Sequence, residues 1–298
     1  MCIRDRHYPL ASDYREIFLA DNNTCKEIIW PLVQDGLRAQ SSAGTNFYVK
    51  AFVNGPMDEL YKTGVGSRGW GNVRAKVSLV DAFDADDVMF DGNDTWGNNK
   101  KDKRAQFMTA LPNQVKDTWD VNMDMTSTFT CGYGYIKWRN VTKEDELSAS
   151  GDAYTSIDFP LFRTADAYLM AAEAILRGAS GTKSEALGYV NEVRTRAYMS
   201  GKYAKNGVRS DVSGEIGANE LDLDFLLLER QKELASELIR RTDLIRFGKY
   251  TKGNNWDWKN GVRLGEDVDD KYNLFPIPES ELTNNPTLVQ NDGYKVIK

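Results

Sequence analysis

Three glutamates in one segment have a spacing that would suit acid–base chemistry. Glu229, Glu233 and Glu237 recur every four residues, so on a helix their carboxyl groups would line one face at separations of about 6 Å. Paired carboxylates at such a distance are typical of retaining glycoside hydrolases. Nearby cations, however, keep carboxylates ionised and unsuited to donating a proton. The segment is rich in them: Arg230, Lys232, Arg240, Arg241 and Arg246. We interpret the glutamates as structural partners of these cations and keep an α-helical glycoside hydrolase as the alternative.

Metal and triad chemistry have little support in the residue counts. The chain has one histidine, His7, and three cysteines (Cys2, Cys25 and Cys131) with no C-x-x-C spacing. Zinc sites and di-iron Glu-x-x-His pairs need more histidines, or a closely spaced pair of cysteines, and this chain has neither. A Ser-His-Asp triad would have to use His7. We therefore predict no catalytic residue, no metal and no cofactor.

Two motifs that resemble ligand sites are better explained as loops. An acidic stretch fails the EF-hand pattern, because Val88 occupies a ligand position and no glutamate follows at the twelfth place, so a solvated loop is favoured over calcium. It contains Asp84, Asp86, Asp87, Asp91 and Asp94. Residues 64–69 match G-x-G-x-x-G but do not join a clear strand to a helix, which favours a turn over a dinucleotide site.

Tryptophans placed among glycine and asparagine are the most useful functional signal. Sugars present apolar C–H faces and polar edges, so their sites combine flat aromatic rings with hydrogen-bonding side chains. Flanking glycines, as around Trp70, let a loop hold a ring outward. Any one tryptophan is more often packed on the core, but we expect at least one to touch ligand. The predicted ligand-binding residues are Trp70, Trp96, Trp119, Asn72 and Asn98. Trp256 and Trp258 are expected to pack on the core or meet a partner protein.

Composition limits the class of protein. The 298 residues carry 38 Lys+Arg against 44 Asp+Glu, a net charge of −6, which argues against nucleic-acid binding. No apolar run reaches the length of a membrane-spanning helix. The first six residues show neither the apolar region nor the cleavage site of a signal peptide.

Helices dominate the second half of the chain, and short strands and turns the first. Residues 163–177 show a 3.6-residue apolar period ended by Gly178, and Thr182 with Glu185 forms a capping box for the next helix. These two helices should pair as an antiparallel hairpin, followed by one long helix over residues 219–247 that ends at Gly248. The expected strands are 27–33, 48–53, 106–111 and 134–138, with a short helix at 78–83. The first of these strands could equally be a helical turn.

Four segments together resemble the RagB/SusD family of nutrient-binding outer-membrane lipoproteins. They are residues 163–174, 189–197, 229–248 and 276–294, in that order and spacing. The motif residues that match are Asp166, Tyr168, Glu173, Asn191, Arg194, Glu229, Arg230, Glu233, Asp243, Arg246, Pro276, Pro278 and Asn285. Weaker similarities upstream extend the match over most of residues 16–294.

The resemblance implies a mostly α-helical fold with tetratricopeptide-like hairpins and a loop-rich, short-stranded ligand-binding region. It divides the chain into an unassigned start (1–15), a loop-rich part (16–158) and a helical scaffold with the C-terminal motif (159–298). Members of the family are typically longer and begin with a lipoprotein signal, so we expect this sequence to be the C-terminal portion of such a protein. Helix-hairpin repeats generally need three or more units, so we also expect the isolated chain to be marginally stable.

The implied function is binding without chemistry. A protein of this kind would be held by a lipid anchor on the outer face of the outer membrane. It would capture oligosaccharides and deliver them to a TonB-dependent transporter, with no nucleic-acid partner. A pure scaffold that contacts only the transporter is a further alternative.

Overall fold

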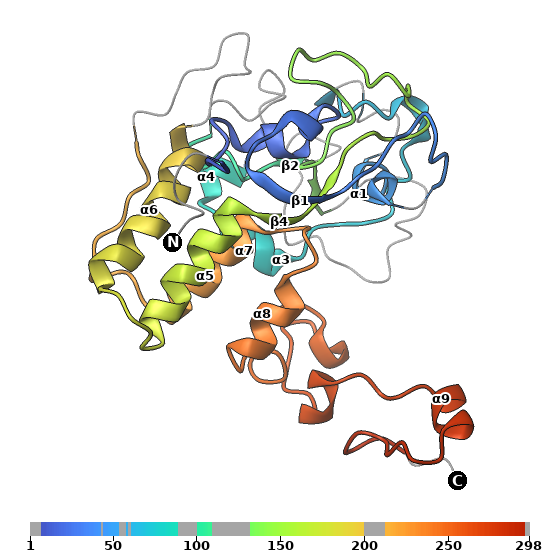
Figure 1. The fold of residues 1–298 in the computed structure, drawn as a ribbon, viewed down its shortest axis with the longest axis vertical. Coiled ribbons are helices and arrows are strands. Elements are labelled where there is room, and N and C mark those ends of the chain that lie inside the picture. The colour runs from blue at the N-terminus through green and yellow to red at the C-terminus, as the bar shows by residue number, and fades with distance from the viewer. Residues whose placement is uncertain are drawn as a thin grey trace. The chain divides into compact units, whose positions relative to one another are not determined.

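The computed structural model describes residues 7–42, 44–53, 58, 61–88, 100–108, 132–199 and 212–295. It divides into two compact units, Met1–Leu238 and Ile239–Lys298. Over the described ranges the chain is mainly helical with short strands, as expected (Figure 1). None of the helices in these ranges is long and apolar enough to cross a membrane.

The helical part of the first unit is built on an antiparallel hairpin. Helices α5 (Thr164–Leu176) and α6 (Lys183–Met199) lie side by side, and α7 (Leu223–Glu233) packs against α5 (Figure 1). The predicted capping box is confirmed, since the Glu185 amide donates to Thr182 Oγ1 (3.2 Å) and the Thr182 amide donates to Glu185 Oε2 (2.7 Å). Small and aliphatic side chains fill the space between these helices: Ala165, Leu169, Ala172, Ala186, Val190, Val193 and Leu226.

The long helix predicted over residues 219–247 is wrong. Helix α7 ends at Glu233, and a new helix, α8 (Arg240–Arg246), begins in the second unit. The carbonyl of Glu233 accepts hydrogen bonds from Arg163 Nη2 (2.8 Å) and Lys137 Nζ (3.3 Å) instead of a helical amide. Ser236 and Leu238 then adopt positive φ angles of 62° and 63°, so long-range hydrogen bonds interrupt an apolar period that alone would have continued.

The loop-rich part of the first unit contains two small antiparallel sheets. One pairs β1 (Ile28–Leu32) with β4 (Phe159–Arg163), and the other pairs β2 (Phe107–Met108) with β3 (Gly134–Tyr135). The strand predicted at 48–53 is wrong, because most of that segment belongs to helix α1 (Thr45–Lys50) and the turn after it. The remaining short elements are η2 (Tyr14–Phe18), η3 (Asn22–Thr24), η4 (Gly66–Arg68), α3 (Val77–Val80) and α4 (Ala85–Val88).

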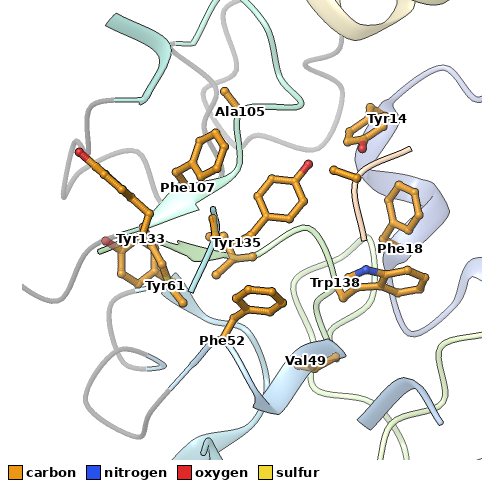
Figure 2. Close-up of a cluster of buried hydrophobic side chains, with 14 of the residues drawn as sticks. Tyr14, Phe18, Val49, Phe52, Tyr61, Ala105, Phe107, Tyr133, Tyr135 and Trp138 are labelled. Atoms are coloured by element: carbon orange, nitrogen blue, oxygen red, sulfur yellow. The ribbon is translucent and has the colours of Figure 1, made fainter. Parts of the chain in front are cut away.

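An aromatic core holds these loops together. Phe18 and Trp138 meet edge to face with ring centroids 4.9 Å apart, and Tyr135 lies beside Phe107 (Figure 2). Tyr48 and Phe159 stack on Trp138 at 5.1 and 5.5 Å. The buried side of helix α1 therefore packs against this core and fixes the position of the helix.

The second unit has little regular structure beyond α8 and α9 (Glu279–Asn284), with 3-10 turns η5 (Lys259–Gly261) and η6 (Asp270–Asn273). Helix α8 ends before Gly248, whose φ of 67° suits glycine, as predicted.

Candidate functional site

The three glutamates form the centre of a buried ion cluster. This cluster comprises Glu27, Asp102, Arg104, Lys137, Arg163, Arg194, Arg196, Glu229, Glu233 and Glu237, all buried. Arg104 Nη1 lies 2.6 Å from Glu229 and 3.2 Å from Glu233. Arg163 lies 2.7 Å from both Glu233 and Glu237.

The cations of this cluster come from distant parts of the chain. The sequence pointed to arginines close to the glutamates, such as Arg230, whereas Arg230 lies 2.9 Å from Asp166 of α5. Glu229 instead forms ion pairs with Arg104 and Arg194, each at 2.6 Å. The structural interpretation therefore agrees with the geometry, and the close ion pairs of these glutamates are made by cations from other segments, which only folding brings together.

The electrostatics of the cluster do not suit acid catalysis. Burial alone would raise the pKa of Glu233, but Arg196, Arg163 and Arg104 outweigh it, so its pKa lies well below the ordinary range. The pKa of Glu237 is lowered in the same way, with Arg163 and Lys137 overcoming burial. A general acid needs a raised pKa and access to substrate. These two carboxyl groups have neither.

The remaining matched motif residues also make internal contacts. Asn191 exchanges hydrogen bonds with the backbone of Ile216 (3.1 and 3.0 Å), and Arg194 lies 2.6 Å from Glu229. Within single segments, Glu173 pairs with Arg177 (2.9 Å) and Asp243 with Arg246 (2.7 Å). Tyr168 is buried and packs on Tyr189, with ring centroids 5.4 Å apart. Pro276 and Pro278 lie just before the start of α9, and the Asn285 side chain accepts a hydrogen bond from the Thr287 amide.

The acidic motif makes hydrogen bonds inside the fold, and the glycine-rich motif forms a turn. The Asp87 carboxylate accepts from the amides of Lys101 (2.6 Å) and Asp102 (3.1 Å), while Asp91 and Asp94 lie outside the described residues. Within the described part of the chain no three acidic, histidine or cysteine side chains gather as a metal site. Gly64 and Gly66 have φ angles of 77° and 52° and lead into η4, which confirms a turn.

Trp70 is held outward beside a second exposed ring that sequence reasoning missed. Phe47 of α1 lies 6.3 Å from Trp70, and the two residues are 46% and 39% exposed. We call Phe47 and Trp70 the aromatic surface. Phe47 carries no local signal in sequence, because only the turn of α1 decides that Tyr48 points to the core and Phe47 away from it.

Backbone hydrogen bonds fix this surface. The Trp70 amide donates to the Lys50 carbonyl (2.8 Å) and the Asn72 amide to that of Ala51 (2.9 Å), so the segment is fastened to the end of α1. Gly71 between them has a φ of 59°, a left-handed conformation that favours glycine. The predicted role of a glycine neighbour is therefore visible in the backbone.

Exposed polar residues lie on both sides of Trp70 in the sequence. Asn72 is exposed. Arg68, in η4, lies 3.1 Å from Asp152 and is largely exposed. The Lys50 ammonium donates to the Ala153 carbonyl and holds that loop against α1. Apolar rings with hydrogen-bonding groups at their edge are the combination that a sugar requires.

The other tryptophans singled out in the sequence, Trp96, Trp119, Trp256 and Trp258, fall into two groups. Trp96, Asn98 and Trp119 lie outside the described residues, so their predicted role stays a prediction. In the second unit, Trp256 and Trp258 are half-buried, and Trp256 packs on Tyr250 (5.3 Å) with Lys259 5.0 Å from its ring.

A second exposed aromatic pair differs in its surroundings. Trp30 of β1 is 62% exposed and lies 6.1 Å from Phe162 of β4. The exposed side chains closest to these rings in sequence are aliphatic: Leu32, Val33 and Leu161. Aliphatic neighbours of this kind suit a sugar less well than polar ones.

Comparisons with known proteins agree with the fold. The model of the SusD family matches residues 26–294. Starch-binding protein SusD of Bacteroides thetaiotaomicron is 31% identical over 97% of this chain and 53% of its own length. The chain thus spans about half the length of that relative.

Solved structures give the same result for the fold. Surface glycan-binding protein A from Bacteroides uniformis superposes with a TM-score of 0.62 at 22% identity, over 97% of this chain and 54% of that one. Surface glycan-binding protein A from Bacteroides thetaiotaomicron, in complex with laminarihexaose, superposes with a TM-score of 0.60 at 22% identity. The match covers 97% of this chain and 57% of that one.

Proposed function

We propose that this chain, which belongs to the SusD family, binds oligosaccharides at the aromatic surface as part of a longer nutrient-capture protein. The single observation that carries the proposal is the Phe47–Trp70 pair, two exposed rings on a rigid backbone with polar side chains at their edge. The starch-binding relative and the laminarihexaose complex of a structural neighbour support a glycan as the ligand class.

We further propose that the protein binds its ligand without chemical change. The carboxylates with hydrolase-like spacing are buried and surrounded by arginines. A sugar cannot reach them, and an ionised carboxylate has no proton to donate. Incubation with starch or laminarin should therefore release no reducing ends. Release that is lost in Glu233→Gln would support the hydrolase alternative instead.

Family membership suggests the partner and the location. We propose that the protein is held by lipid on the outer face of the outer membrane and passes its ligand to a TonB-dependent transporter of the SusC type. Co-purification of such a transporter with the tagged natural protein, extracted in mild detergent, would test this partner.

Calorimetric titration with oligosaccharides tests glycan binding directly. Trp70→Ala should weaken binding by tenfold or more, roughly the loss seen when a central aromatic anchor is truncated. Trp30→Ala is the matched control, because it removes an equally large exposed ring whose exposed sequence neighbours are aliphatic and should leave the affinity unchanged. Equal losses in both variants, or binding that survives Trp70→Ala, would contradict the assignment of the surface. No binding in the unaltered chain would support a scaffold that contacts only the transporter.

A further inference from the structure

We infer that the second unit carries a docking surface for the part of the longer protein that this chain lacks, and that the occupant is an apolar helix face. We call this surface the apolar strip. It consists of Tyr272, Leu274 and Phe275, which are 46%, 60% and 71% exposed. The inference rests on the proposed function in one respect, that this chain is part of a longer nutrient-capture protein. The apolar strip shares no residue with the aromatic surface.

The second unit has its apolar side chains on the outside. Among its described residues, 239–295, Leu244 is the only apolar side chain that is buried. The large apolar side chains that are exposed are Val262, Leu264, Tyr272, Leu274, Phe275, Leu288 and Val289. A compact unit is normally stabilised by apolar side chains that are removed from water. The inverted distribution indicates a surface that another part of the protein covers.

Arg241 of α8 fixes the backbone of the apolar strip. Its Nη2 donates to the carbonyls of Tyr272 (2.9 Å) and Asn273 (3.3 Å). The same guanidinium lies 4.2 Å from the centroid of the Phe275 ring, where a cation–π contact covers one face of the ring. The ring remains largely exposed, so its other face is presented to solvent.

Side chains of the last segment bind the carbonyls of the same stretch. The donors and acceptors are Tyr294 Oη to Leu274 (2.8 Å), Asn291 Nδ2 to Phe275 (2.8 Å) and Gln290 Nε2 to Ile277 (2.9 Å). Pro276 and Pro278 stiffen the stretch further, because proline fixes its own φ and restricts the preceding residue to extended conformations. The apolar strip therefore has a defined shape before anything covers it, and covering it costs little conformational entropy.

The same hydrogen bonds limit what the occupant can be. The carbonyls of residues 272–275 are already bonded within the unit, so an added strand finds no free acceptors there for a ladder. The occupant must make contact through apolar side chains instead. An α-helix satisfies its own backbone and offers such side chains as a stripe along one face.

The size of the apolar strip favours an occupant that is covalently joined to this chain. The exposed parts of its three side chains amount to roughly 300–400 Å², below the approximately 800 Å² that each partner contributes to a stable complex. A tethered surface bears less of the entropic cost of association than a separate protein does. This chain spans 53% of starch-binding protein SusD and 54% of the Bacteroides uniformis protein, so a longer protein of this kind has enough chain to supply the helix.

Hydrogen–deuterium exchange on this chain and on the full natural protein tests the inference. The peptide with residues 271–277 should exchange tenfold or more slowly in the full protein than in this chain. Phe275→Asp in the full protein should remove that protection and lower its Tm by several degrees, because a charge is then buried under the helix. The same substitution should change the Tm of this chain much less, because the ring is already exposed there. Phe275→Leu is the matched control and should keep most of the protection.

Equal exchange of this peptide in the two proteins overturns the inference, as does an equal loss of Tm from Phe275→Asp in both. Sedimentation of this chain tests a second copy as the occupant. Dimers that Phe275→Asp dissociates would assign the strip to that copy and overturn the inference. A natural gene that encodes this chain alone overturns it as well.

Calorimetry keeps this inference separate from the function it rests on. Phe275→Asp in this chain should leave the oligosaccharide affinity unchanged, because the ring belongs to another surface. If the exchange result overturns the docking surface while Trp70→Ala still weakens binding, glycan binding at the aromatic surface stands. If the peptide is protected in the full protein and neither protein binds an oligosaccharide, the docking surface stands and the proposed glycan binding fails.

Discussion

The buried ion cluster and the aromatic surface use opposite kinds of residue in opposite places. The cluster puts carboxylates and guanidiniums in direct contact inside the first unit, where no ligand reaches them. The aromatic surface leaves large parts of two rings exposed to solvent. Charged groups are normally solvated and rings normally buried, so each region departs from the usual rule, but for different reasons.

The difference teaches which departure points to function. Buried charges are tolerated when they are mutually satisfied, and they then fix the geometry of the segments that supply them. Exposed rings stabilise nothing unless something covers them. The glutamates with hydrolase-like spacing therefore serve the fold, while the surface that we propose for the ligand consists of aromatic rings, which have no acid–base chemistry.

The largest expected effect lies in the cluster. Glu233→Ala removes the carboxylate shared by Arg104, Arg163 and Arg196 and leaves these buried cations with fewer carboxylates than the cluster needs to balance them. We expect a loss of about 3–5 kcal/mol in the free energy of unfolding, measured by urea denaturation. The control Glu144→Ala, at an exposed position, should change it by less than about 0.5 kcal/mol. A small loss for Glu233→Ala would mean that the cluster is not a structural centre.

Acid should separate the two regions without any substitution. Glu233, Glu237 and Asp102 have pKa values lowered in the fold, because their arginine and lysine partners outweigh burial. Their contribution to stability is present above the unfolded pKa values of about 4 and is lost as the pH falls below them. Glycan affinity should stay constant between about pH 5 and 8, because neither ring titrates there and arginine stays charged. An affinity that changes across that range would mean that a titrating group takes part in glycan binding.

A backbone substitution should affect the aromatic surface more than the fold. Gly71→Ala places a Cβ at a φ of 59°, which costs about 1–2 kcal/mol, and strain at this turn should tilt the Trp70 ring. We expect a loss of about 1 kcal/mol in stability and a severalfold loss of oligosaccharide affinity by calorimetry. Gly188→Ala, within α6 and with open space at its Cβ, should instead be neutral or slightly stabilising. Unchanged affinity in Gly71→Ala would mean that the backbone does not hold the ring.

The smallest expected effect is a change in how steeply the unfolding free energy depends on pH in the alkaline range. Burial lowers the pKa of Lys137 to about 8, although Glu237 favours the charged form. Between this value and the ordinary 10.5 the unfolded chain binds more protons, so Lys137 makes stability rise with pH in that window. Lys137→Met should flatten the rise between about pH 8 and 10, measured as unfolding free energy at each pH. Lys143→Met, at an exposed position, should leave the slope unchanged, and an equal slope in both variants would contradict the assignment.

The helical hairpin shows where prediction from the sequence succeeds. The apolar period of residues 163–177, the capping box at Thr182 and Glu185, and the glycines Gly178 and Gly248 after α5 and α8 are local signals, and the structure confirms each of them. They persist because the hydrogen bonds involved join residues a few positions apart. The family resemblance rested largely on the same segments.

The errors share one cause. The helix predicted over 219–247 breaks because Arg163 and Lys137 capture the Glu233 carbonyl, and residues 48–53 are mainly helical and turn because α1 packs Tyr48 on Trp138. In both cases a residue far away in the sequence decides the local conformation. Phe47 was missed for the same reason, since its exposure depends on what covers the other side of α1.

By itself, the sequence determined the mainly helical class, the hairpin, the turn glycines and the family, because each depends on short-range pattern. Only the tertiary structure decided which arginines hold Glu233, that its carboxylate is inaccessible, and that Phe47 joins Trp70. Ion pairs and surface sites depend on distances between segments up to 169 residues apart, as between Glu27 and Arg196. No local pattern encodes such distances, because they are set by how the whole core packs.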